Sequence, residues 1–317
     1  MAEMMTNREA YGRALVALGE KNPDVVALEA DLGASTHSYL FGKRFPERYF
    51  SMGVAEANMM GAAAGMAASG KIPFASTFCV FAAMRAVEQV RNSIAYPNLN
   101  VKVVGTNAGI EIGPDGATHQ ATEDIAIMRA IANMTVVAPS DPVMTAKLVG
   151  RAAELSGPLY MRMGRQPTPY VYDKDQDFEI GKAVLLRPGG DITLVAVGNM
   201  VWRALEAAQI LQDEGISARV LDMHTLKPID EAALLTAARE TGCVVTAEDH
   251  NVIGGLGGAV AEVLSAKWPV PVIRVGLRDT FAQSGSTEEL FEFYGMTPAH
   301  IAAAAREALQ ARDDRGR

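Results

Sequence analysis

Glu56 is a single carboxylate near the start of a small and apolar run, GVAEANMMGAAAGMAASG, at residues 53–70. The run predicts a buried helix over 55–70 whose Ala and Gly residues let another backbone approach closely. An unpaired carboxylate in such a place would cost several kcal/mol, so Glu56 needs a partner. Two explanations stay open at this point: a first-turn acid that satisfies a helix N-terminus, or a catalytic group.

A second set of polar residues lies in GTNAGIEIGPDGATHQATED at 105–124. Asp115 and His119 follow a predicted strand in a glycine-rich loop. Irregular backbone there can bring polar side chains to the carboxyl edge of a parallel sheet. A lone histidine is more often structural, so this loop needs support from other motifs.

Further candidates have an ordinary explanation beside a functional one. Phe78 and Phe81 in TFCVF have a spacing that is more typical of a helical core face than of a cofactor site. Arg8 and Arg165 carry planar guanidinium groups suited to phosphate oxygens, although Arg8 also fits an exposed helix position. Asp31 in EADLGAST fits a strand end or a helix cap equally well.

The glycines of CVVTAEDHNVIGGLGGAVAEVL follow a strand and open a helix, as in a dinucleotide-binding fingerprint. The G-x-G-x-x-G register is not met, and the next strand lacks the usual lone ribose-binding acid. We therefore interpret the cluster as a tight strand-to-helix turn, and an NAD-dependent oxidoreductase remains the alternative of different chemistry.

The elements that must position these residues alternate between strand and helix, which predicts an α/β fold of two three-layer domains with mainly parallel sheets. Thr6 is expected to cap the first helix, which ends near residue 20. Expected strands are 25–31, 71–77, 101–106, 135–140, 158–163, 191–198, 217–223, 243–249 and 270–276. Further expected helices are 79–96, 121–133, 141–155, 199–214, 230–241, 256–267 and 298–312. Proline, aspartate and glycine in QPTPYVYDKDQDFEIGKAVLLRPGGD place the domains at 1–172 and 191–317, with a linker over 173–190.

Composition limits the class of protein. The chain has 317 residues, 49% of them hydrophobic, and a formal net charge of -8, which argues against a nucleic-acid or anionic-membrane surface. Two cysteines provide neither a disulfide framework nor a zinc cluster, so a reducing cytoplasm fits best. The N-terminus does not read as a secretory signal, and residues 53–70 would make a poor membrane span.

Taken together, these segments resemble the transketolase family over essentially the whole chain. Residues 27–36, 53–70, 76–91 and 105–124 are similar to its pyrimidine-binding domain, and the second half resembles its C-terminal domain. The most specific elements are DGATHQ, beside the family's D-G-P-T-H-Q, and a Glu in G-x-x-E before a small-residue helix. The resemblance implies a transferase that depends on thiamine diphosphate.

The resemblance also implies residues for the cofactor. Glu56 would be catalytic: it would hydrogen-bond a ring nitrogen of the cofactor's aminopyrimidine, so that the cofactor's own amino group can remove the thiazolium proton. Phe78 and Phe81 match aromatic positions that wrap the pyrimidine ring. Asp31 resembles an aspartate near the cofactor at the dimer contact.

Other residues would bind the sugar. His119 matches a catalytic histidine that faces both cofactor and sugar, and Asp115 matches the residue that holds a hydroxyl of the acceptor aldehyde. Arg165 and Arg8 match the arginines for the substrate phosphate, with Ser35 as a hydroxyl donor. These matches imply transfer of a two-carbon ketol unit between phosphorylated sugars.

The sequence departs from the family at Asn107, in GTNAG, where a histidine commonly helps to recognise the ketose donor. The donor therefore stays open. The family's metal and diphosphate motif, a G-D-G followed by an Asn, belongs to a separate N-terminal domain, and RPGGDI at 187–192 does not replace it. We expect the C-terminal-half subunit of a split enzyme, whose N-terminal partner brings the diphosphate ligands and Mg²⁺ or Ca²⁺. An α2β2 heterotetramer is expected, with helix 55–70 near a subunit contact.

Related alternatives are the β subunit of a 2-oxo acid dehydrogenase and a deoxyxylulose phosphate synthase-like enzyme. The first carries a different loop in place of DGATHQ, and the second is normally a single chain. A regulatory subunit without catalysis is the remaining alternative, which Glu56, Asp115 and His119 together disfavour.

Overall fold

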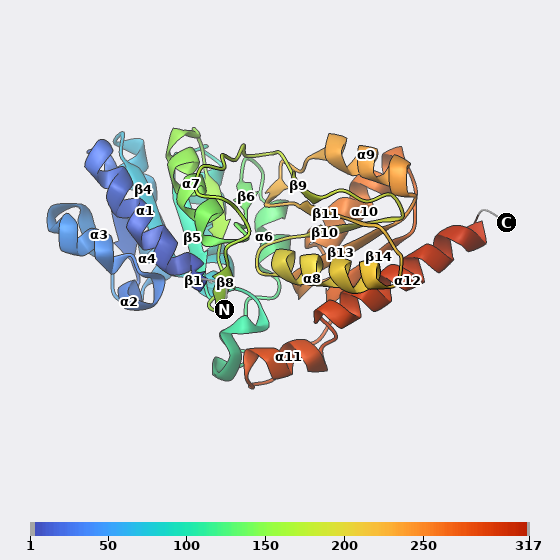
Figure 1. The fold of residues 1–317 in the computed structure, drawn as a ribbon. Coiled ribbons are helices and arrows are strands. Elements are labelled where there is room, and N and C mark those ends of the chain that lie inside the picture. Colours follow the sequence, from blue (N-terminus) through green and yellow to red (C-terminus); the bar gives the residue numbers. More distant parts are fainter. Residues whose placement is uncertain (1–3, 316–317) are drawn as a thin grey trace.

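Two α/β units, each built on its own sheet, make up the chain (Figure 1). The computed structural model describes residues 4–315. The first sheet has the order β12-β6-β7-β5-β4-β2-β3, and its strands are parallel except for β12. These strands are β2 (Val25–Glu29), β3 (Tyr49–Ser51), β4 (Ile72–Phe78), β5 (Lys102–Thr106), β6 (Thr135–Val137), β7 (Leu159–Arg162) and β12 (Thr225–Lys227).

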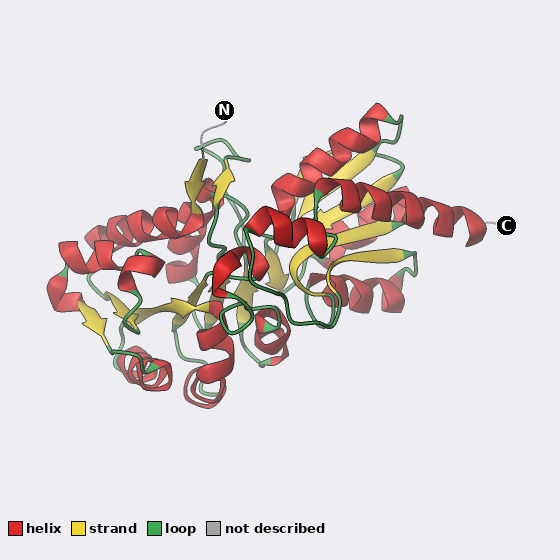
Figure 2. Cartoon of the chain, turned by 90° about the horizontal axis from the view of Figure 1, so that it is seen from below, coloured by secondary structure: helices red, strands yellow, loops and turns green. Residues whose placement is uncertain are grey.

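Helices cover both faces of this sheet because its strands are apolar on both sides. In β2, Val25 and Ala27 join a core cluster with α1 and α7, whereas Val26 and Leu28 join another with α4. The helical elements are α1 (Asn7–Lys21), α2 (Gly33–Thr36), α3 (Tyr39–Arg44), η1 (Pro46–Arg48), α4 (Glu56–Ala68), η2 (Phe81–Arg85), α5 (Val87–Gln89), η3 (Val90–Ala95), η4 (Ile110–Asp115), α6 (Asp124–Ala130) and α7 (Pro142–Glu154). Figure 2 shows helices on both sides of the strands.

The second sheet has the order β14-β13-β10-β11-β9, and only β9 is antiparallel to its neighbour. Helices α8 and α12 pack on one face, and α9 and α10 on the other. Its strands are β9 (Val184–Arg187), β10 (Ile192–Ala196), β11 (Ala218–Asp222), β13 (Val244–Asn251) and β14 (Val272–Leu277). Its helices are α8 (Met200–Asp213), α9 (Glu231–Thr241), α10 (Leu256–Lys267), α11 (Thr287–Phe293) and α12 (Pro298–Arg315). A separate ribbon pairs β1 (Met4–Thr6) with β8 (Pro167–Pro169).

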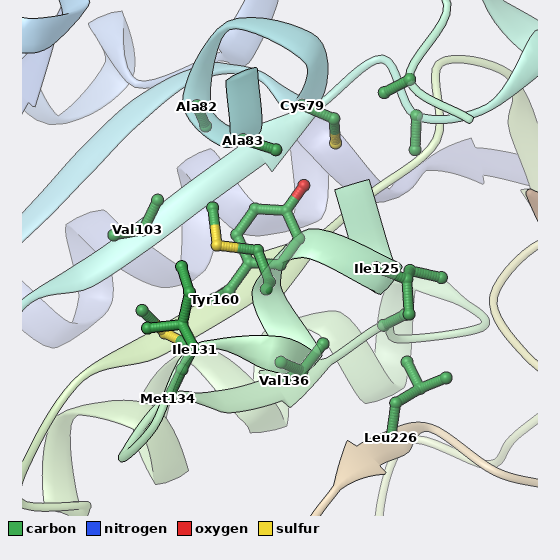
Figure 3. Close-up of a cluster of buried hydrophobic side chains, with 14 of the residues drawn as sticks. Cys79, Ala82, Ala83, Val103, Ile125, Ile131, Met134, Val136, Tyr160 and Leu226 are labelled. Carbon is green, nitrogen blue, oxygen red and sulfur yellow. The ribbon is translucent and has the colours of Figure 1, made fainter. Parts of the chain in front are cut away.

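One hydrophobic cluster runs from the first unit into the second. Tyr160 of β7 lies within it, near Val136 of β6 and Ile125 of α6 (Figure 3). Leu226 reaches this cluster from β12, which comes from the second half of the chain but pairs antiparallel with β6. The two units therefore share a core.

The fold class predicted from the sequence is confirmed. The side chain of Thr6 caps α1 as expected, since its hydroxyl accepts from Glu9 N at 3.2 Å. The predicted helix over 79–96 is interrupted by the π-helical turns η2 and η3, and the predicted helix over 121–133 is reduced to α6.

The short strands β3, β9 and β12 were not predicted, because their pairing comes from sheet partners elsewhere in the chain. β9 falls inside the range expected for the linker, and the domain boundaries stay a prediction. Within residues 4–315, no helix combines the length and apolar character needed to cross a membrane.

Candidate functional site

Glu56 is the first residue of α4 and is almost completely buried, with 1% of its surface exposed. Its partner in this chain is Arg85, whose Nη1 donates to both carboxylate oxygens at 2.9 Å. The other half of this pair is open to solvent, because the side chain of Arg85 is 48% exposed. The carboxylate is thus balanced by a cation that can move, and the sequence analysis did not identify Arg85.

The π-helical turn η2 places Arg85 beside an aromatic pair. Its wide turn is closed by Ala86 N, which donates to Phe81 O at 3.2 Å, and such turns are frequent at functional sites. The Arg85 guanidinium lies over the Phe81 ring, 4.1 Å from its centroid. Phe81 stacks on Phe78 with 5.8 Å between centroids and 14° between planes.

His119 completes this group from the glycine-rich loop. Its ring meets the edges of Phe81 and Phe78 at centroid distances of 5.5 and 6.4 Å. Its Nδ1 lies 2.9 Å from Thr118 Oγ1. One carboxylate, two phenyl rings and one imidazole, expected from separate motifs, therefore form a continuous row in which the Arg85 guanidinium joins Glu56 to Phe81.

The predicted sugar-binding residues form a second group, held together by Arg8. Its guanidinium donates to Ser35 O at 2.7 Å, to Asn107 Oδ1 at 3.3 Å and to Arg165 O at 3.0 Å. The contact with Ser35 uses the backbone carbonyl and leaves the hydroxyl out. Arg165 in turn donates to Asp115 Oδ2 at 3.1 Å.

The electrostatics of this group favour an anion. Burial and then the neighbouring Arg165 charge lower the pKa of Arg8. Burial and then Arg8 also lower the pKa of His37, which ends α2 in a left-handed conformation. Two guanidinium groups whose charges repel each other are stabilised by a bound anion such as phosphate.

Asp31 lies apart from these contacts. It follows β2 with a positive φ of 60° and is exposed. Within residues 4–315 its side chain makes no hydrogen bond. The side chain of this strand-end acid is therefore accessible from outside the chain.

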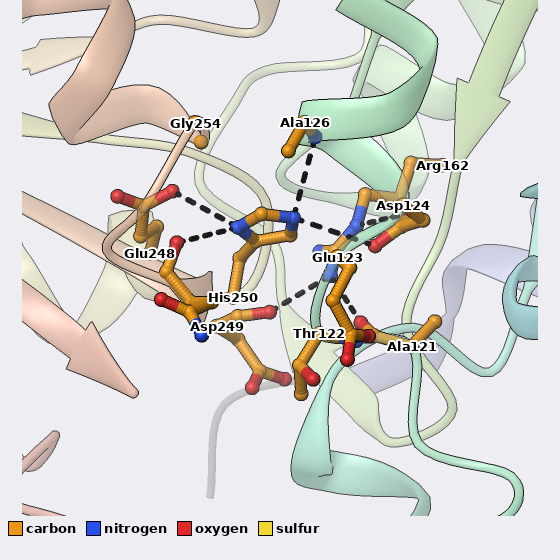
Figure 4. Close-up of polar contacts among 12 residues, drawn as sticks. Ala121, Thr122, Glu123, Asp124, Ala126, Arg162, Glu248, Asp249, His250 and Gly254 are labelled. Carbon is orange, nitrogen blue, oxygen red and sulfur yellow. Dashed lines mark hydrogen bonds and ion pairs between the residues drawn. The ribbon is translucent and has the colours of Figure 1, made fainter. Parts of the chain in front are cut away.

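A buried polar network joins the site loop to the second unit (Figure 4). Arg162 Nε donates to Asp124 Oδ2 at 2.9 Å, and Arg162 Nη2 donates to Asp249 O at 2.8 Å. His250 lies between Asp124 and Glu248, with its ring nitrogens 4.0 and 3.7 Å from their carboxylates. Sequence reasoning missed these residues, although charged groups inside apolar strands are a signal that they are buried and paired.

Glu111 is the other buried acid beside this network. Burial and the nearby Asp249 raise the pKa of Glu111 to about 7. Its carboxylate accepts from Gln166 N at 3.1 Å and from the amide of Asn199. A carboxyl group that resists ionisation is consistent with this dry position between the units.

The glycine cluster holds a carboxyl group of this chain, whose pKa burial raises to about 7. Glu248 accepts from the backbone N–H groups of Leu256 and Gly257 at 2.6 and 2.8 Å, at the start of α10. A Cβ on Gly255 would lie 1.9 Å from the Glu248 carboxylate. The glycines thus make room for an internal carboxylate, in agreement with a structural turn and against a dinucleotide phosphate.

Metal ligands were not expected in this chain. No group of three or more His, Cys, Asp or Glu side chains arranged for a metal ion occurs in the described part, residues 4–315.

Comparisons with known proteins agree on one family. The model for "Transketolase, pyrimidine binding domain" matches residues 3–170, and the model for "Transketolase, C-terminal domain" matches residues 181–301. A "Putative transketolase C-terminal section" of Methanocaldococcus jannaschii is 48% identical over 306 residues, 96% of each chain. The "6-deoxy-6-sulfo-D-fructose transketolase subunit SqwH" of Clostridium sp. is 46% identical, over 97% of this chain and 96% of its own. A solved structure described as "Split gene transketolase, inactive beta4 tetramer" is 54% identical, with a TM-score of 0.92 over 97% of this chain and 99% of its own.

Proposed function

The chain belongs to the transketolase family as a C-terminal section, and on this premise we propose that it transfers a two-carbon ketol unit between phosphorylated sugars together with a separate N-terminal subunit. The family is that of thiamine diphosphate-dependent transferases. The observation that carries the proposal is the continuous row of Glu56, Arg85, Phe81, Phe78 and His119.

The residues of this row fit the aminopyrimidine half of thiamine diphosphate. Phe78 and Phe81 offer aromatic faces for a flat heterocycle, and Glu56 offers a buried carboxylate that can share a proton with a ring nitrogen. When bound, the cofactor supplies the carbon nucleophile that the twenty amino acids lack. For Glu56 to contact the ring nitrogen, Arg85 must release one or both carboxylate oxygens. The Arg85 side chain is half exposed and can turn toward solvent to do this.

The sugar would bind beside this row. His119 faces the aromatic pair and is placed to exchange a proton with a sugar hydroxyl. Asp115 and Arg165, paired at 3.1 Å, would bind an acceptor hydroxyl and the substrate phosphate, with Arg8 behind them. Asn107 holds Arg8 and would set the donor preference in place of the family histidine.

The anionic group on the sugar needs a direct test, because one relative is named for a sulfonated sugar. A guanidinium pair can donate to either phosphate or sulfonate oxygens. Phosphorylated and sulfonated substrates should therefore be compared, and a preference for the sulfonate would contradict our assignment.

The diphosphate and its Mg²⁺ would be held by the N-terminal subunit, in an α2β2 heterotetramer with Asp31 and α4 near the subunit contact. The solved structure at 54% identity is described as an "inactive beta4 tetramer" of a split-gene transketolase. This description supports the proposal that the present chain is inactive without its partner subunit. The low cysteine count supports a cytoplasmic location.

The first experiment is a coupled assay for ketol transfer from xylulose 5-phosphate to ribose 5-phosphate, with thiamine diphosphate and Mg²⁺. We would test this chain alone and mixed with an N-terminal transketolase subunit from the same organism. We expect activity only in the mixture, with a heterotetramer in size-exclusion chromatography. Full turnover by the chain alone would contradict the split enzyme, and oxidation of a 2-oxo acid by the mixture would favour the dehydrogenase alternative.

A further inference from the structure

The loop that carries Asp115 and His119 is bound by the second unit on both sides of these residues. At its start, Asp249 of β13 accepts from Ile110 N at 2.9 Å through Oδ1 and from Glu111 N at 3.4 Å through Oδ2. The first turn of η4 is therefore attached to a side chain more than one hundred residues away in the sequence.

Gly109 allows this close approach. It has a φ of +64°, and a Cβ at this position would lie 2.0 Å from Asp249 Oδ2. Any larger residue would both strain the backbone and displace the carboxylate. The carboxylate and this glycine thus form one fitted contact between the two units.

Asp249 is itself held in place. Its side chain is buried, with 1% of the residue exposed, and Oδ2 also accepts from Asn199 Nδ2 at 3.3 Å. Its backbone carbonyl accepts from Arg162 at 2.8 Å. A group with these restraints can transmit its position to the loop.

Further contacts continue along the loop. Thr287 Oγ1 of α11 donates to Glu111 O at 3.1 Å, and Gln120 Nε2 donates to Gln283 O at 3.0 Å. Asn251 N donates to Thr122 O at 2.8 Å. The contacts at Ile110, Glu111, Gln120 and Thr122 flank Asp115 and His119, so the loop cannot shift without breaking bonds to the second unit.

We infer that Asp249 is a positioning residue for substrate recognition: it fixes the loop so that Asp115 and His119 meet the sugar. The inference rests on the proposed function for the role of these two residues. Through Asp249, the C-terminal domain would thus contribute to substrate binding without touching the sugar itself. Of the row, only His119 lies on the loop that Asp249 holds, whereas Glu56, Phe78 and Phe81 lie on α4, at the end of β4 and in η2.

The test compares Asp249→Asn with Asp222→Asn. Asn keeps the shape of Asp249 but replaces one acceptor oxygen with an NH2 group, so the variant can accept from only one of Ile110 N and Glu111 N. Asp222 is the matched control, since it is equally buried at the end of β11 in the same sheet but accepts from Ser140 and Tyr172, outside the loop. Thr287→Val is a second variant that removes one loop contact without touching Asp249.

In the complex with the N-terminal subunit, Asp249→Asn should lower kcat/KM for ribose 5-phosphate by about tenfold or more, as small displacements of catalytic groups do. The dissociation constant for thiamine diphosphate should change much less, because Glu56, Phe78 and Phe81 lie outside this loop. Thr287→Val should act in the same direction with a smaller effect, and Asp222→Asn should match the wild type in both measurements. Equal losses in the two Asp variants, or a loss of cofactor affinity in Asp249→Asn as large as its loss of kcat/KM, would overturn the positioning role.

Hydrogen exchange of the full chain separates this inference from the proposed function. Backbone amides of residues 109–120 should exchange about tenfold faster in Asp249→Asn than in the wild type or Asp222→Asn, which corresponds to about 1.4 kcal/mol. Unchanged exchange would overturn the inference even if the complex is a transketolase. If the wild-type complex does not transfer ketol units, the proposed function fails, and faster exchange would still establish Asp249 as the anchor of the loop.

Discussion

Replacing Arg162 with Met should destabilise the protein far more than replacing any surface arginine. Arg162 is 5% exposed and its partner Asp124 is fully buried, with 2.9 Å between Arg162 Nε and Asp124 Oδ2. Burial alone would lower the pKa of Arg162, but the carboxylate of Asp124 raises it overall. Met fills most of the volume, so the main effect is a buried carboxylate that has lost its cation.

The expected loss of stability is about 3 kcal/mol, near the lower end of the range for broken buried pairs. The lower end applies because the Tyr160 hydroxyl still donates to Asp124 Oδ2 at 2.7 Å. Two further hydrogen bonds are lost, from Arg162 Nη2 to Ala121 O and to Asp249 O, the second of which joins the two units.

Urea unfolding at fixed protein concentration measures this loss. With a slope of about 3 kcal/mol per M, the midpoint should fall by about 1 M. Adding Asp124→Asn to Arg162→Met removes the stranded charge, so the double variant should lose at least about 1 kcal/mol less than the sum of the single variants. Arg151→Ala, which breaks an exposed pair with Asp177, serves as the control and should leave the midpoint near that of the wild type. A midpoint for Arg162→Met equal to that of the control, or strict additivity in the double variant, would refute the reasoning.

Three further predictions test other parts of the structure. Glu56→Gln keeps the shape but not the charge, and should lower kcat of the complex at least about 100-fold with an unchanged melting temperature; full activity would favour a subunit without catalysis. Burial raises the pKa of Asp222 to about 7. The stability that its neutral form contributes is fully present below the unfolded pKa near 3.8 and is lost as pH rises through 7. The melting temperature of the wild type should therefore fall relative to that of Asp222→Asn between pH 5 and pH 8, and a constant difference would refute this. A Cβ at Gly109 would lie 2.0 Å from Asp249 Oδ2, whereas Gly53 has a similar positive φ and a Cβ there would meet nothing within 4 Å. Both Ala variants carry a backbone cost of about 1–2 kcal/mol, so only Gly109→Ala should lose more stability than this in urea unfolding. Equal losses would show that Asp249 moves away freely.

Local patterns in the sequence were sufficient for the fold class and for most of the elements. A continuous run of β-branched and apolar residues predicted β2, and a hydroxyl before an amphipathic run predicted the cap at Thr6, because both effects act between residues near in the sequence. The glycine-rich loop predicted that Asp115 and His119 would reach the edge of the sheet. The Glu56 run indicated a carboxylate that needs a partner, and its place at the first turn of α4 follows from the same local signal.

Tertiary structure alone decided which distant groups meet. Arg85 pairs with Glu56 only because a π-helical turn folds it over Phe81, and no local pattern encodes that register. β12 joins the first sheet, and Asp249 reaches Ile110, through contacts between residues far apart in the chain. Such contacts depend on the packing of the two units around a shared core, since their free energy comes from burying partners together rather than from the spacing of either one.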